Sequence, residues 1–148
     1  MDREEYMIDS ATILLVEDNP DDAALTEVAL RGWPAHLEIA RDAEEAVDYL
    51  FCNTHNKPRL VLLDLGLPDT GGLEVLRRIR QDERTRLIPV VILTSSMVPR
   101  DVAASYRMGA NSYVRKPVDF DEFSERIRQI GSYWLRTNEP PWADCDGD

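Results

Sequence analysis

The sequence predicts an α/β protein in which helices cover both faces of one five-stranded parallel sheet. Five short runs of aliphatic and β-branched residues alternate along the chain with segments of helical periodicity. Three of these runs are apolar at successive positions, so they have no face that could meet solvent and belong in the middle of a sheet covered on both sides. Strict alternation of strand and helix with right-handed crossovers gives a doubly wound sheet.

The strands are predicted from the apolar runs. In chain order they are residues 13–16, 37–40, 60–63, 89–93 and 112–115. The first, third and fourth are the continuously apolar runs, which places them at the centre of the sheet. The second and fifth carry polar residues within the run, so we expect them at the two edges.

A predicted helix follows each strand. The apolar stripes that mark four of these helices are Leu25, Val28 and Ala29; Ala43, Ala46, Val47, Leu50 and Phe51; Leu73, Leu76 and Ile79; and Phe120, Phe123, Ile127, Ile130 and Trp134. The remaining helix begins near Pro99, which suits a first helical turn, and ends at Gly109. We expect Phe120, Phe123 and Ile127 to pack back against their own sheet.

Length and charge exclude several classes of function. The 148 residues match a single domain, and 28 acidic against 17 basic residues leave a net charge of -11. This charge would repel nucleic acid and anionic membranes. The apolar runs are all far shorter than the roughly 18 residues of a membrane helix, and residues 1–10 lack the features of a signal peptide. We therefore expect a cytoplasmic protein that binds neither nucleic acid nor membrane.

Composition divides the chain into one domain and two ends. Residues 1–10 are rich in charge and predict a flexible arm, and residues 11–136 form the domain. Residues 137–148 are acidic and contain a Pro-Pro pair, which predicts a tail too short and polar to be an output domain. Cys52 and Cys145 are far apart in sequence and are expected to be reduced.

Polar residues collect at the carboxyl ends of the predicted strands, where ligands bind in open α/β sheets. They are Glu17 and Asp18 after the first strand, Asp64 after the third, Thr94 after the fourth and Lys116 after the fifth. Asp64 follows a buried run, so its carboxylate needs a cation, and Lys116 and a bound metal are the candidates. Asp18 has a second possible role as the N-cap of the helix that starts near Pro20.

Clustered carboxylates without histidine or thiolate favour Mg²⁺ over zinc or copper. Mg²⁺ keeps coordination positions for water and for phosphoryl oxygens. A carboxylate can attack phosphorus to give an aspartyl phosphate when cations offset the charge on the equatorial oxygens. Mg²⁺ on one side of Asp64 and Lys116 on the other would supply that charge, and the Thr94 hydroxyl can donate to a further oxygen.

Six motifs in this order resemble the receiver domain of two-component response regulators, which has the flavodoxin-like form of the doubly wound fold. The motifs are Leu15-Val-Glu-Asp-Asn-Pro20, Leu62-Leu-Asp-Leu-Gly-Leu-Pro68, Gly72-Leu73, Leu93-Thr-Ser95, Gly109-Ala110 and Arg115-Lys-Pro117. The resemblance covers roughly residues 11–135.

The resemblance implies a role for each matching position. Asp64 would be the phosphoacceptor, and Asp18, Asp64 and the Gly66 carbonyl would bind Mg²⁺, with Glu17 assisting through water. Thr94 and Lys116 would contact the phosphoryl group. Tyr113 would be a switch residue that turns inward when Thr94 moves, and the bond before Pro117 would be cis, which proline allows at low cost.

The resemblance is strongest to stand-alone receivers that partner phytochrome-type histidine kinases, through the VEDNP and DLGLP segments and the closing Ile130-Gly-Ser-Tyr-Trp-Leu135. Such a protein would signal to a downstream protein that the sequence does not identify, and would not be a turnover enzyme. Gly66 and Ser96 are smaller than the residues often found there, so the lifetime of the phosphoryl state stays open.

Two alternatives to the phosphorylated receiver differ from it in the residues that they require. A hydrolase that forms an aspartyl phosphate needs a second acid two residues after the nucleophile, and that position is Gly66, which disfavours it. A degenerate receiver that only binds partners would be expected to lose Asp64, Asp18 or Lys116, and all three are present. The degenerate receiver, a phosphorylation-independent protein-binding module, is the alternative function.

Two surface features complete the predictions. Tyr133, Trp134 and Leu135 end the last helical stripe and are expected to be exposed, where they would form a homodimer interface together with the fourth and fifth helices and the fifth strand. Five arginines, Arg77, Arg78, Arg80, Arg84 and Arg86, are expected to form a solvated helix face.

Overall fold

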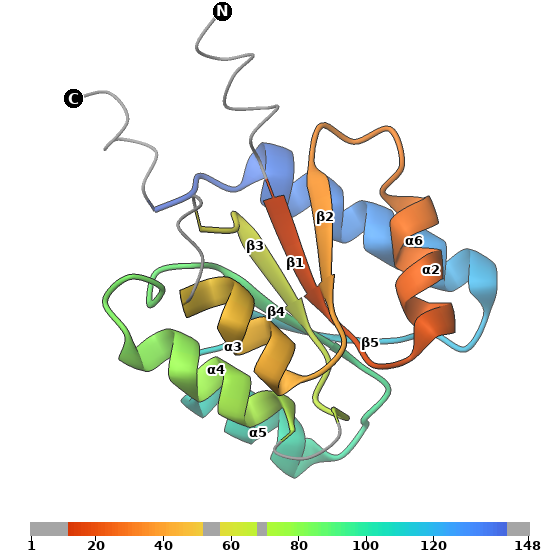
Figure 1. The fold of residues 1–148 in the computed structure, drawn as a ribbon. Coiled ribbons are helices and arrows are strands. Elements are labelled where there is room, and N and C mark those ends of the chain that lie inside the picture. Colours follow the sequence, from red (N-terminus) through yellow and green to blue (C-terminus); the bar gives the residue numbers. More distant parts are fainter. Residues whose placement is uncertain (1–11, 52–56, 68–70, 142–148) are drawn as a thin grey trace, which may run out of the picture.

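The computed structural model describes residues 12–51, 57–67 and 71–141, and within them the predicted fold class is confirmed. Its five parallel strands are β1(Thr12–Val16), β2(His36–Ala40), β3(Leu60–Leu63), β4(Val90–Thr94) and β5(Ser112–Arg115). The sheet order is β2-β1-β3-β4-β5 (Figure 1), so the second and fifth strands are the edges, as predicted. β4 lies one residue later than the predicted run, at Val90–Thr94.

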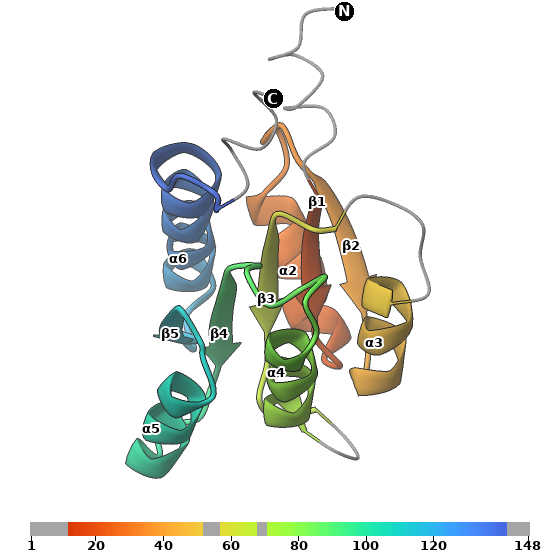
Figure 2. The same ribbon diagram turned by 90° about the vertical axis from the view of Figure 1, so that its left-hand side faces the viewer.

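Helices cover both faces of the sheet (Figures 1 and 2). On one face lie α2(Pro20–Ala29) and α6(Phe120–Ser132), and on the other lie α3(Ala43–Phe51), α4(Gly72–Gln81) and α5(Pro99–Arg107). α6 continues into a short π-helical segment, η1(Tyr133–Thr137), which the sequence pattern did not predict. Within the described part of the chain, helices that are both long and apolar enough to cross a membrane are absent.

The two faces of the sheet explain why the central strands are continuously apolar. Leu14 and Val16 of β1 join the core cluster under α3 and α4, whereas Ile13 and Leu15 join the cluster under α2 and α6. β3 and β4 alternate in the same way between the two clusters. Because successive side chains point to opposite faces, each of these strands needs apolar residues at every position.

Two of the predicted core residues are exposed. Val28 is 53% exposed, because α2 turns Ala23, Thr26 and Ala29 inward instead. The Thr26 hydroxyl donates to the carbonyl of Asp22 at 2.8 Å, so its burial leaves no unpaired donor. Phe120 is 68% exposed because it is the first residue of α6, at the turn that leads into the helix, whereas Phe123 and Ile127 pack on the sheet as expected.

Gly72 allows α4 to begin directly against the end of β3. A Cβ at this position would lie 2.3 Å from the carbonyl oxygen of Asp64 and 2.9 Å from the Cα of Leu65. Real Cβ atoms do not approach backbone this closely, so the site tolerates only glycine. The first turn of α4 is thereby held beside the residue that ends the central strand.

Several predictions fall on residues outside the described ranges. They concern the arm at residues 1–10, the segment 142–148 of the predicted tail, and both cysteines, Cys52 and Cys145. The structure does not test these predictions.

Candidate functional site

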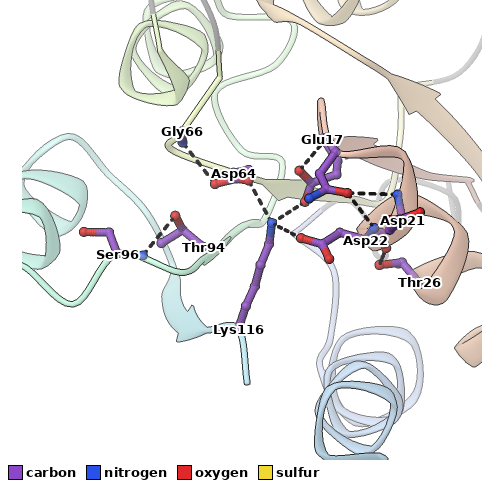
Figure 3. Close-up of polar contacts among 10 residues, drawn as sticks. Glu17, Asp21, Asp22, Thr26, Asp64, Gly66, Thr94, Ser96 and Lys116 are labelled. Carbon is purple, nitrogen blue, oxygen red and sulfur yellow. Dashed lines mark hydrogen bonds and ion pairs between the residues drawn. The ribbon is translucent and has the colours of Figure 1, made fainter. Parts of the chain in front are cut away.

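Four strand ends bring the predicted polar residues to one edge of the sheet (Figure 3). Glu17 and Asp64 follow β1 and β3, Thr94 ends β4, and Lys116 follows β5. The backbone ladder continues through these positions, because the Asp64 N–H donates to the Val16 carbonyl at 3.1 Å and the Lys116 N–H to the Thr94 carbonyl at 2.8 Å. The sheet itself therefore sets the spacing of these side chains.

Lys116 lies at the centre of the cluster. Its Nζ is 2.5 Å from Glu17 Oε1, 2.8 Å from Asp64 Oδ2 and 2.9 Å from Asp22 Oδ2. Only 7% of the Lys116 side chain is exposed, so these contacts are made largely out of water. One ammonium with three donors thus meets three carboxylates.

Asp22 was not predicted to belong to this site. It lies in the first turn of α2 beside Asp21, and both residues carry the ordinary signal of a helix N-terminus, where acids are favoured. Which of the two reaches the strand ends depends on the rotation of α2 about its axis. A sequence pattern of adjacent acids does not specify this.

The charges in the cluster shift one another's pKa values in different directions. Burial raises the pKa of Glu17 from 4.5 to about 7, with the Asp64 charge adding to the rise and Lys116 opposing it. Burial would also raise the pKa of Asp64, but the bonds from Lys116 and from the Gly66 N–H outweigh it and lower that pKa. Burial would lower the pKa of Lys116, and its three carboxylate partners reverse the effect and raise it. The pKa of Glu17 is thus raised and the pKa of Asp64 is lowered within the same buried cluster.

Three carboxylates offer oxygens to a divalent cation. The ligand atoms of Glu17, Asp18 and Asp64 lie within 4.8 Å of one another. The cap of α2 is Asn19, whose Oδ1 accepts from the backbone N–H groups of Asp21 at 2.9 Å and Asp22 at 3.2 Å. Asp18 is thus not the helix cap, and its carboxylate is exposed beside the other two. This set of hard oxygen donors suits Mg²⁺ or Mn²⁺ and not a thiophilic metal.

An open pocket of about 420 Å³ lies over the cluster. Its lining includes Asp18, Asp22, Asp64, Gly66, Thr94 and Lys116. Gly66 contributes its backbone, since its N–H donates to Asp64 Oδ1 at 3.0 Å. The pocket therefore gives a ligand direct access to the Asp64 carboxylate.

Ser96 links the two predicted switch residues. The Tyr113 hydroxyl donates to the Ser96 carbonyl at 3.1 Å, and the Ser96 N–H donates to Thr94 Oγ1 at 3.4 Å. The Ser96 hydroxyl in turn donates to Asp101 Oδ2 at 2.5 Å, at the start of α5. Thr94 and Tyr113 thus both bond to the same loop residue, Ser96, and the contact with Asp101 was not predicted from the sequence.

The prediction of a cis bond before Pro117 is wrong, because the Lys116–Pro117 peptide bond is trans. Trans is the lower-energy form of a bond to proline by about 0.5–1 kcal/mol, so cis occurs only where the surroundings favour it. Lys116 reaches all three carboxylates with the bond in trans. The placement of the ammonium therefore does not require the cis form.

The last residues of the α6 stripe differ in exposure. Tyr133 is 49% exposed, as predicted, and its ring meets Trp134 edge to face at 5.0 Å between centroids. Trp134 and Leu135 are only half-buried and not exposed, because they pack against the core cluster under α2 and α6. These residues lie away from the acidic cluster.

Arg80 departs from the solvated arginine face predicted for α4. It is half-buried, and its Nε donates to the Gly109 carbonyl at 2.8 Å. A second nitrogen donates to the Ile88 carbonyl and a third to Asn111 Oδ1, each at 2.8 Å. Arg80 therefore ties α4 to the turn that precedes β5. The neighbouring Arg77 does pair with Glu74 on the helix surface, as the prediction expected.

Comparison with protein families gives one match that spans most of the chain. The family described as response regulator receiver domain matches residues 13–128. A probable methanogenesis regulatory protein, FilR2 of Methanothrix harundinacea, is 41% identical over 138 residues, which cover 90% of this chain and 89% of FilR2. Response regulator Rcp1 of Synechocystis sp. is 37% identical over 137 residues, which cover 88% of this chain and 93% of Rcp1.

Solved structures agree with the sequence comparison. The Mn²⁺-bound form of Rcp1 matches with a TM-score of 0.84 and 36% identity, covering 88% of this chain and 99% of that structure. The phosphorylated cyanobacterial phytochrome response regulator RcpA matches with the same TM-score of 0.84 and 36% identity, covering 88% and 98% of the two chains.

Proposed function

Because the chain belongs to the response regulator receiver family, we propose that it accepts a phosphoryl group on Asp64 from the phosphohistidine of a sensor histidine kinase. Mg²⁺ would be its cofactor, and its output would be a change of surface that another protein reads. Its similarity to the phytochrome response regulators supports a phytochrome-type kinase as the donor.

One observation carries this proposal. The Asp64 carboxylate is bonded to Lys116 Nζ at 2.8 Å, a contact that lowers its pKa, and it lines an open pocket of about 420 Å³. A carboxylate in this position combines nucleophilic charge with access for a phosphoryl donor.

The residues around Asp64 suit an in-line phosphoryl transfer. One Asp64 oxygen attacks phosphorus while the bond from phosphorus to the histidine nitrogen breaks, and the imidazole leaves with that electron pair. Lys116 donates to a phosphoryl oxygen and offsets part of its charge. Thr94, only 3% exposed at the end of β4, presents its hydroxyl to a further oxygen.

The donor set fits a divalent cation. Asp18, Asp64 and the Gly66 carbonyl would hold Mg²⁺, with Glu17 assisting through a water molecule. When bound, Mg²⁺ would supply positive charge that offsets the charge on the phosphoryl oxygens. The Mn²⁺-bound form of the relative Rcp1 supports a metal of this hard class.

We propose that the protein is a phosphoacceptor and not a turnover enzyme. Incubation with acetyl phosphate and Mg²⁺ should add one phosphoryl group to the intact mass, and addition of EDTA should prevent it. A protein that stays unmodified with Mg²⁺ present would favour the alternative of a degenerate receiver that binds partners without phosphorylation. Phosphotransfer profiling against candidate kinases would then identify the donor.

The switch proposal rests on the Ser96 contacts. A movement of Thr94 toward a phosphoryl oxygen would alter its bond to the Ser96 N–H, and Tyr113 holds the carbonyl of the same residue. Tyr113 lies on β5, between α5 and α6 at the sheet edge. The face formed by α5, β5 and α6 is therefore the one that phosphorylation would alter.

We propose that this face forms a homodimer. Tyr106 of α5 is 51% exposed and Tyr133 is 49% exposed, and Trp134 lines a shallow pocket beside β5 with Val114 and Ile130. Large aromatic residues are favoured anchors of interfaces. Light scattering at micromolar concentration, with and without beryllofluoride, tests the idea. A monomer under both conditions would refute the dimer, and a dimer that beryllofluoride leaves unchanged would refute its coupling to phosphorylation.

The charge of the chain supports the remaining proposals about its surroundings. A net charge of -11 disfavours nucleic acid and anionic lipid as partners and is compatible with a cytoplasmic signalling protein. Fractionation of the host cell into cytosol and membrane would test the location.

A further inference from the structure

Lys116 is shared between the phosphoacceptor and a helix that lies outside the predicted site (Figure 3). Its Nζ is 2.8 Å from Asp64 Oδ2 and 2.9 Å from Asp22 Oδ2. Asp22 belongs to α2, and Asp64 ends the central strand. The ammonium thus lies between two carboxylates, Asp64 and Asp22, at nearly the same distance from each.

The backbone of Asp22 is held in the first turn of α2. Its backbone N–H donates to Asn19 Oδ1 at 3.2 Å, and its carbonyl accepts from the Thr26 hydroxyl at 2.8 Å. Both bonds hold the first turn of α2 in place. The Asp22 carboxylate is therefore anchored on the α2 side of the pocket, and its attraction for the ammonium acts in that direction.

The carboxylates that bind Lys116 differ in solvent exposure, and so in the free energy lost when the ammonium moves away from each. The Glu17 side chain is 2% exposed, so loss of the Lys116 donor would leave it buried without its cation. The Asp22 side chain is 25% exposed and lines the open pocket, so water can replace the ammonium there. The ion pair between Asp22 and Lys116 would therefore compete with a bond from Lys116 to a phosphoryl group on Asp64.

We propose that Asp22 is a positioning residue that draws the Lys116 ammonium toward α2 and so weakens its bond to a phosphoryl group on Asp64. The inference rests on the proposed function of Asp64 as phosphoacceptor. Through this competition Asp22 sets how strongly the phosphorylated state is stabilised. Without the negative charge of Asp22, the Lys116 ammonium can donate its hydrogen bonds to the phosphoryl oxygens.

Asp21 provides a matched control. It lies next to Asp22 in the same turn, carries the same charge, and donates its backbone N–H to the same Asn19 oxygen at 2.9 Å. The ion pair to Lys116 comes from Asp22. Asp22→Asn and Asp21→Asn therefore remove the same charge from the same helix end, and only the first removes a carboxylate bonded to Lys116.

The test is a titration with beryllofluoride, a mimic of the phosphoryl group, at constant Mg²⁺, followed by ¹⁹F NMR of the bound fluoride. Asp22→Asn should bind beryllofluoride about three- to tenfold more tightly than the wild type. Asp21→Asn should bind within about twofold of the wild type, because a solvated charge is strongly screened. Asp22→Glu, which keeps a carboxylate at this position on a side chain one methylene longer, should restore an affinity near that of the wild type.

The outcomes separate this inference from the function on which it rests. Equal affinities of Asp22→Asn and Asp21→Asn, or weaker binding by Asp22→Asn, would overturn the role of Asp22. A wild type that shows no bound fluoride with Mg²⁺, and that gains no phosphoryl group from acetyl phosphate, would overturn the proposed function itself. Circular dichroism of each variant confirms that the comparison is made between folded proteins.

Discussion

The basic side chain of Lys116 is buried and that of Arg80 is half-buried, and the two are satisfied by different kinds of partner. Lys116 donates to three carboxylates, whereas Arg80 donates to the backbone carbonyls of Gly109 and Ile88 and to the amide oxygen of Asn111. Burial lowers the pKa of Arg80. Burial would do the same to Lys116, but its carboxylate partners reverse the direction and raise that pKa.

The side chains of Arg80 and Lys116 also differ in how closely other atoms pack around them. A Cβ on Gly109 would lie 3.0 Å from Arg80 Nε, and this glycine has a φ of +105° at the end of α5, so the Arg80 contacts close tightly around the side chain. Lys116 instead borders an open pocket and is outnumbered by carboxylates. Neutral oxygens and close packing indicate a structural cation, whereas a surplus of negative charge beside open space indicates a site for a further cation.

The largest effect should come from removing the nucleophile beside Lys116. Asp64→Asn should abolish phosphoryl incorporation from acetyl phosphate, because the amide has nearly the same shape but lacks the nucleophilic charge. Intact mass spectrometry measures the incorporation. Labelling of the variant at the wild-type level would place the phosphoacceptor at another residue.

The contrasting substitution is Arg80→Met, which should lower stability and leave phosphorylation in place. It leaves several carbonyl oxygens without their charged donor and should lower the free energy of unfolding by about 3 to 4 kcal/mol. Urea unfolding of the two proteins gives the difference. Arg86→Met, at an exposed arginine of the same segment, should stay within about 0.5 kcal/mol of the wild type. Loss of phosphorylation in a folded Arg80→Met protein would contradict a purely structural role.

The raised pKa of Glu17 predicts a pH dependence of stability. Between pH 4.5 and about 7 the folded state holds a proton that the unfolded chain has released, so this residue stabilises the fold at low pH and the contribution is lost as the pH rises. Asp64 acts in the other direction, because its lowered pKa stabilises the fold above pH 3.8 and this is lost as the pH falls.

Glu17→Gln isolates the first effect. With EDTA present, the free energy of unfolding of the variant should rise relative to the wild type by about 2 to 3 kcal/mol between pH 4.5 and 7. Urea unfolding at several pH values measures this difference. Glu44→Gln, at an exposed glutamate, is the control for the loss of one surface carboxylate. A constant difference between Glu17→Gln and the wild type would show that Glu17 does not titrate in this range.

The smallest effect concerns the cation that the surplus of carboxylates should attract. At a Mg²⁺ concentration tenfold above its Kd, binding should stabilise the wild type by about 1.4 kcal/mol and raise its Tm. Asp18→Ala should show much less of this shift, whereas Asp21→Ala should keep it. Equal shifts in the wild type and Asp18→Ala would place the metal elsewhere.

The fold followed from the sequence because its signals are local. Continuous apolar runs required two covered faces, and the structure places those runs at the centre of the sheet. The order of the strand ends then brought Glu17, Asp64, Thr94 and Lys116 together. These predictions needed only the strand positions and the rule that ligands bind at the carboxyl edge of the sheet.

The errors concern features that depend on rotation or on contacts across the fold. Asp22 and Val28 both depend on how α2 is turned about its axis, and its weak amphipathic pattern does not specify that angle. In the sequence, Arg80 does not differ from the other arginines near it. Its burial depends on Gly109 and Asn111, which lie 29 and 31 positions away. The isomer before Pro117 likewise depends on surroundings that the local sequence does not describe.

The separation of the site residues along the chain has a consequence for biosynthesis. Lys116 is 99 positions from Glu17 and 52 from Asp64, and it follows the last strand of the sheet. A nascent chain that has not yet emerged beyond β4 carries the carboxylates without the lysine. Contacts between such distant residues form late, because long loops must close first. Under the proposed function, completion of the sheet would therefore be a condition for phosphorylation, and a half-made chain on the ribosome would not accept phosphoryl groups from a kinase.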